Sequence, residues 1–154
     1  IGNDGSFYFN IGYNNAVAQW SDALEWSFAT VAQNDADIVV HGGTRTELEV
    51  LMGDSFNYLT ASTAGITFYD YNVVGYYQYQ GNIKLHAKMN SATIYIPDDG
   101  RTADEYRNIL THELGHALGY IGHSASASDV MYPYVSTIYD LSTRDINHLH
   151  QLYP

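Results

Sequence analysis

The order of apolar and polar positions in the first quarter of the chain predicts alternating strands and a helix. The aromatic segment 6–13 predicts a strand, and the helical spacing of apolar residues over 17–24 predicts a helix. Further strands are predicted at 26–31 and at 37–41, the latter around the apolar run Ile-Val-Val. A strand, a helix and two more strands indicate an α/β (α+β) fold.

The pattern after residue 81 changes from strands to helices. Segments 82–89 and 92–97 each predict a strand, and the turn-prone pair Asn90–Ser91 separates them. Thr102 with Glu105 forms the signature of a capping box, which predicts a helix that continues to Ala117.

A last helix is predicted after Ser142, which has Asp145 three residues later. Residues 42–81 carry no clear period, although 46–52 has the composition of a helix. The middle of the chain is therefore left without a predicted arrangement.

Length, charge and composition narrow the class of protein. The 154 residues predict one domain, 1–154, and 45% hydrophobic residues with 15 tyrosines indicate a folded chain. No apolar run reaches the roughly 18 residues of a membrane span. A formal net charge of -11 argues against nucleic acid and anionic membranes as partners. The absence of cysteine leaves histidine and carboxylate as the strong metal ligands.

The segment HELGH carries the clearest chemistry in the sequence. His112 and His116 lie four residues apart on the predicted helix, so both imidazoles project from one face and can chelate one ion. Glu113 is adjacent to them, as in the H-E-x-x-H arrangement, where two histidines bind zinc and the glutamate is the general base. The alternative is an ordinary helical turn with histidines facing solvent, which we consider less favoured because histidine is uncommon.

A hydrolytic zinc site typically has three protein ligands, so a third one is needed. No glutamate follows Glu113, which leaves as candidates His123, His148, His150 or an aspartate such as Asp129. Gly119 is a plausible helix end and can fold the chain back toward the metal, which favours His123 and leaves Asp129 as the weaker alternative. His148 and His150 face opposite ways on the predicted last helix, so a surface role is expected for at least one.

Two motifs in this order resemble those of a known clan. HELGHALGYIGH at 112–123 resembles the zinc signature of the metzincin metalloproteases, and DVMYPYV at 129–135 resembles their methionine-containing turn. The closing segment LSTRDINHLHQLY is typical of the matrixins, the matrix-metalloprotease type, within that clan. The resemblance implies a twisted, mostly parallel sheet with an antiparallel edge strand, an active-site helix, a Met-turn and a C-terminal helix.

The sequence also departs from the family pattern. Three residues separate Gly119 from His123, whereas the usual signature has two, and we expect Gly122 to give the turn the flexibility to absorb the extra one. Arg144 stands where matrixins generally have an aspartate.

The resemblance assigns further roles near the predicted zinc. It implies that Met131 packs beneath the metal and that Pro133 and Tyr134 line the pocket for the substrate side chain after the cut bond. Residues 83–89 are candidates for an exposed edge strand onto which an extended peptide adds, although lysines there would serve equally to block aggregation. Asp98, Asp99 and Asp104 are candidates for a calcium site, for which a solvated surface is the better interpretation.

Together these observations predict a secreted, monomeric zinc endopeptidase that acts on proteins or peptides. Zinc would be held by His112, His116 and His123, and Glu113 would take the proton of the attacking water and pass it to the leaving amine. The alternative from another class is a non-catalytic extracellular module that keeps zinc for structure and binds proteins. An enzyme acting on a small-molecule amide would share the chemistry.

Overall fold

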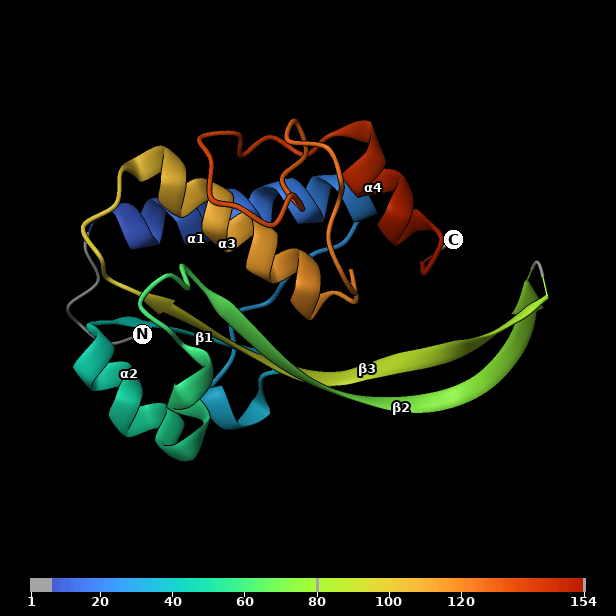
Figure 1. The fold of residues 1–154 in the computed structure, drawn as a ribbon, viewed down its shortest axis with the longest axis horizontal. Coiled ribbons are helices and arrows are strands. Elements are labelled where there is room, and N and C mark those ends of the chain that lie inside the picture. Colours follow the sequence, from blue (N-terminus) through green and yellow to red (C-terminus); the bar gives the residue numbers. More distant parts are fainter. Residues whose placement is uncertain (1–6, 80, 154) are drawn as a thin grey trace.

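The computed structural model describes residues 7–79 and 81–153 (Figure 1). The elements follow in the order α1 (Phe7–Leu24), a 3-10 turn (Gln33–Asp35), β1 (Ile38–Gly43), α2 (Arg45–Met52), a second 3-10 turn (Gly53–Tyr58), β2 (Ile66–Tyr79), β3 (Asn82–Pro97), α3 (Ala103–Ala117) and α4 (Thr143–His150). None of the described helices is long and apolar enough to cross a membrane.

The sheet contains both parallel and antiparallel pairs, in the strand order β1-β3-β2. β1 runs parallel to the second half of β3, from Ile38 opposite Ala92 onward, and β2 runs antiparallel to β3 along a long hairpin. The hairpin extends well past the helices in Figure 1. The predicted α/β fold with an antiparallel edge strand is therefore confirmed.

One detail of the predicted strands is wrong. β3 continues through Asn90 and Ser91 without a turn, because its residues on both sides stay paired with β2. Residues 83–89, candidates for an exposed edge strand, pair with β2 on one side, and β1 pairs with β3 only from Ala92 to Pro97. Their use as an edge strand stays a prediction, and β2 is the outer strand where all three strands pair.

The aromatic start of the chain is a helix and not the predicted strand. Phe9, Ala16 and Trp20 are buried and recur at helical spacing, which places them along one face of α1. α1 and α3 approach closely, because a Cβ on Gly12 would lie 2.6 Å from the carbonyl oxygen of Tyr106. Residues 26–31, also predicted as a strand, form no helix or strand.

Two apolar clusters enclose the sheet. The larger one fills the space between the sheet and α1 and α3, and the smaller one joins α2 to the opposite face through Leu48, Met52 and Leu59. Figure 1 shows α1 and α3 on one side of the sheet and α2 on the other. This arrangement fixes α3 against β3, with its histidine-bearing end next to the start of β2.

Capping boxes begin the two C-terminal helices as predicted. The Thr102 hydroxyl accepts from the Glu105 backbone amide while the Glu105 carboxylate accepts from the Thr102 backbone amide at 2.9 Å. Ser142 and Asp145 form the same reciprocal pair at the start of α4. These caps satisfy amide groups that a helix start leaves without partners.

Candidate functional site

His112 and His116 project from one face of α3 with their Nε2 atoms 3.0 Å apart. The Nδ1 atom of His112 lies 2.8 Å from the Val130 carbonyl oxygen, and that of His116 lies 2.7 Å from the Tyr120 carbonyl oxygen. A carbonyl oxygen can only accept, so each Nδ1 carries the proton and each Nε2 presents a lone pair. Burial lowers the pKa of both imidazoles, that of His112 to about 4, which also favours the neutral form.

His123 completes a group of three histidines despite the longer loop. The ligand nitrogens of His112, His116 and His123 all lie within 4.8 Å of one another, and the described residues contain no other group of three or more potential ligands this close. The His123 ring centroid is 5.1 Å from that of His112 and 5.0 Å from that of His116. The displaced histidine is therefore brought to the other two.

The turn between α3 and His123 absorbs the extra residue through two glycines. Gly119 has φ +101° and Gly122 has φ +91°, values that other residues rarely adopt. The first turn is closed by the Tyr120 amide, which donates to the Gly115 carbonyl oxygen at 2.9 Å. A Cβ on Gly122 would meet nothing within 4 Å, so a larger residue would have space there. Glycine suits this position because of the positive φ, not because of its small size.

The chain after His123 is anchored by a buried aspartate. The Ser124 amide donates to the Met131 carbonyl oxygen at 2.7 Å, and the Ser124 hydroxyl donates to Asp129 at 2.5 Å. Arg144 donates to the same carboxylate through Nε at 2.8 Å and through Nη2 at 2.5 Å. Arg144 lowers the pKa of Asp129 to about 2, with help from Ser124. Asp129, the alternative third ligand, is thus bound to an arginine, and Arg144 has a definite structural partner.

Met131 packs against α3 between the two histidines of that helix. The side chain is fully buried, and a Cβ on Gly115 would lie 2.6 Å from its sulfur atom. Asp145 accepts from the backbone amides of Val130 at 3.1 Å and Met131 at 3.3 Å, which fixes the turn from α4. A methionine-containing turn therefore lies against the histidine-bearing helix.

Glu113 follows His112 on α3, and its side chain is buried and held by β2. Its Oε2 atom accepts from the Thr67 hydroxyl at 2.6 Å, and Gly65 lies against its Cγ and Oε1 atoms. Burial raises the pKa of Glu113 to about 7, against the opposite effect of the Thr67 hydrogen bond. Sequence reasoning missed Gly65 and Thr67, because no spacing rule links them to a residue some 46 positions later.

The other candidate residues lie outside this group of histidines. Pro133 and Tyr134 follow the Met131 turn and are exposed, so their role in a substrate pocket stays a prediction. His148 stacks on Tyr120 at 3.9 Å, and His150 Nε2 lies 2.8 Å from the Ala23 carbonyl oxygen.

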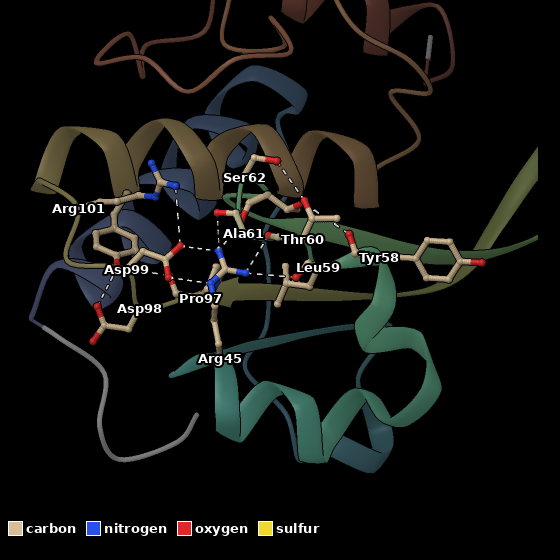
Figure 2. A network of polar contacts seen from close by, with 12 residues as sticks. Arg45, Tyr58, Leu59, Thr60, Ala61, Ser62, Pro97, Asp98, Asp99 and Arg101 are labelled. Atoms are coloured by element: carbon tan, nitrogen blue, oxygen red, sulfur yellow. Dashed lines mark hydrogen bonds and ion pairs between the residues drawn. The ribbon is translucent and has the colours of Figure 1, made fainter.

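The three aspartates considered for calcium have separate partners. Asp99 pairs with Arg45 at 2.7 Å, Asp104 pairs with Arg107 at 2.6 Å, and Asp98 accepts from the Tyr106 hydroxyl at 2.9 Å. Figure 2 shows Asp98 and Asp99 turned toward these different groups. They are not gathered around one point.

The sequence was also compared with known proteins. No curated protein matches it. The family model for matrixin (peptidase family M10) matches residues 10–154, a span that includes the sheet, most of α1, all of α3, the three histidines and the Met131 turn. Matrixins are metalloproteases, as the geometry of these residues would suggest. The chain belongs to the matrixin family.

Proposed function

We propose that the protein is a secreted zinc-dependent endopeptidase whose metal is held by His112, His116 and His123. One observation carries this proposal. The lone pairs of two neutral imidazoles face each other at 3.0 Å, with both Nδ1 protons engaged by carbonyl groups. Such lone pairs repel unless a cation lies between them, and imidazole nitrogen is a preferred zinc ligand. Zinc bound there would supply Lewis-acid chemistry to a water and to the scissile carbonyl.

Glu113 is proposed as the general base. It follows His112 directly in the chain, and its buried carboxylate accepts a hydrogen bond from the Thr67 hydroxyl. In the proposed reaction the carboxylate takes one proton from the attacking water and delivers it to the nitrogen of the leaving amine as the peptide bond breaks. The balance is one water consumed, one acid and one amine formed.

The substrate is proposed to bind at β2 and at the turn that follows Met131. A polypeptide would lie extended along the outer edge of β2, the strand that also contacts Glu113. Pro133 and Tyr134 would line the pocket for the side chain after the cut bond, a role that rests on their place after the Met131 turn. A single domain over 1–154, a monomeric state and secretion are proposed from the family likeness. Calcium stays a possible further ion, but no site for it is proposed at Asp98, Asp99 and Asp104, because these carboxylates have other partners.

The test is hydrolysis of an unfolded protein by the zinc-loaded chain, with and without a chelator, beside Glu113→Gln. We expect cutting that stops with the chelator, returns with zinc, and falls by about 100-fold or more in the variant, since a positioned general base contributes that much. Glu49→Gln, an exposed glutamate on α2, is the matched control and should cut like the wild type.

A zinc-bound protein that cuts neither proteins nor peptides would contradict the endopeptidase. That result would favour the non-catalytic binding module, or an enzyme for small-molecule amides if an amide of that kind is hydrolysed.

A further inference from the structure

Thr67 lies at the start of β2, and its hydroxyl reaches the one carboxylate that the proposed reaction uses as a base. We propose that Thr67 is the positioning residue for Glu113, holding one carboxylate oxygen so that the other faces the water. This inference rests on the proposed function of Glu113.

The contact has the geometry of a strong, charge-assisted hydrogen bond. Thr67 Oγ1 lies 2.6 Å from Glu113 Oε2 and 3.1 Å from the Glu113 backbone carbonyl oxygen. A hydroxyl donates a single hydrogen, and the shorter distance assigns it to the carboxylate. Oε1 is left as the oxygen that exchanges the proton.

Gly65 restricts the same side chain from a second direction. A Cβ at Gly65 would lie 2.9 Å from Glu113 Cγ, 3.0 Å from Glu113 Oε1 and 2.8 Å from Ile96 Cδ1. The backbone at Gly65, immediately before β2, therefore packs against one side of the Glu113 side chain, while the Thr67 hydroxyl holds its carboxylate. A side chain confined in this way loses little freedom when the reaction begins.

The strand that carries Thr67 is held by its pairing with β3 and by the contacts of the loop that precedes it. Along β2, Ile66 pairs with Tyr95 and Thr67 pairs with Ile94, which is fully buried. The loop that leads into β2 is bound by Arg45, which donates to the carbonyl oxygens of residues 59, 60, 61 and 63 and to Asp99 (Figure 2). The hydroxyl is thus presented from a fixed backbone.

The first test compares Thr67→Val, which removes the donor at nearly constant size, with Thr67→Ser, which keeps it. We expect kcat of the zinc-loaded protein to fall about 10- to 100-fold in Thr67→Val, since hydrogen bonds to charged groups have that effect, with KM and zinc content unchanged. Thr67→Ser should recover most of kcat. Thr93→Val, the same change on the neighbouring strand β3, is the control and should leave kcat unchanged.

The second test has a readout other than turnover. Acetohydroxamate chelates zinc and offers a proton to a nearby carboxylate, so its binding to the zinc-loaded protein reports the position of Glu113. Calorimetric dissociation constants are measured for the wild type, Thr67→Val, Glu113→Gln and the double variant. Thr67→Val should weaken binding about 10-fold with Glu113 present and have no effect with glutamine at 113.

The outcomes separate this inference from the proposed function. If Glu113→Gln cuts normally, the proposed function fails and the inference fails with it. If Glu113→Gln is inactive but folded Thr67→Val keeps the wild-type kcat, the inference alone is overturned. The same holds if Thr67→Val weakens acetohydroxamate binding equally with glutamate and with glutamine at position 113. If Thr67→Val does not show cooperative thermal unfolding, Thr67→Ala replaces it in both tests. The smaller alanine leaves room for a water where the threonine hydroxyl was.

Discussion

The ion pair between Asp129 and Arg144 is expected to stabilise the segment that follows His123. Replacing Arg144 by methionine keeps the apolar stem of the side chain and removes the charge. The Asp129 carboxylate is fully buried, whereas the Arg144 side chain is 63% exposed. The substitution therefore leaves a buried anion with its serine partner but without its cation.

The magnitude follows from the pKa of Asp129, which is lowered from 3.8 to about 2 with Arg144 as the largest cause. At about 1.4 kcal/mol for each pH unit this corresponds to about 2 kcal/mol for all causes together. Ser124 and Ser142 supply part of this total, and water around the exposed guanidinium screens the contribution of Arg144, so Arg144→Met should cost only a fraction of it.

The pH dependence has a definite sign. A carboxyl group with a lowered pKa stabilises the folded state above its unfolded value and loses that contribution as the pH falls through its folded value. The difference in free energy of unfolding between the wild type and Arg144→Met should be constant from pH 7 to about pH 5, shrink below 3.8, and vanish below about 2.

Urea unfolding across this pH range is the assay. Arg107→Met is the matched control, because its pair with Asp104 is a partly exposed (i, i+3) contact, and we expect it to cost less than about 1 kcal/mol at every pH. The reasoning is refuted if Arg144→Met costs nothing at pH 7, if its cost persists undiminished below pH 2, or if the control costs more.

Two further predictions concern glycines near the histidines. Gly115→Ala should destabilise the protein by about 1–3 kcal/mol, because the added methyl group would lie 2.6 Å from the Met131 sulfur. Thermal unfolding measures this loss, and an unchanged midpoint would contradict the packing of Met131 against Gly115. Gly122→Ala should cost about 1–2 kcal/mol in urea unfolding through its positive φ alone, and a loss of that size without any clash would separate backbone strain from packing.

The sequence predicted those parts of the site that are local in the chain. His112, Glu113 and His116 lie within one helical turn and a capping box marks where that helix begins, so spacing alone placed them. His123 was predicted from Gly119 and the family likeness, and the structure brings it to the other two histidines. Short-range geometry decides all of these positions.

The features that the sequence did not predict depend on partners that lie far away in the chain. The aromatic residues at 6–13 predicted a strand, but Phe9 belongs to a helical stripe that packs on the core, and tertiary packing outweighs such propensities. Thr67 stands in the region without a readable period, and only strand pairing carries it to Glu113. Asp129 has the chemistry of a ligand, and its arginine lies 15 residues away.

The guanidinium of Arg45 occupies a place between carbonyl oxygens and a carboxylate that a hard cation would also suit. Because this positive charge is part of the chain, dilution cannot remove it and a chelator cannot extract it. The order of the loop that leads to Gly65 and Thr67 is therefore independent of the free ion concentration around the protein. A loss of activity on chelation would then not come from release of an ion by this loop, and the three histidines are the group of potential ligands that the described residues bring together.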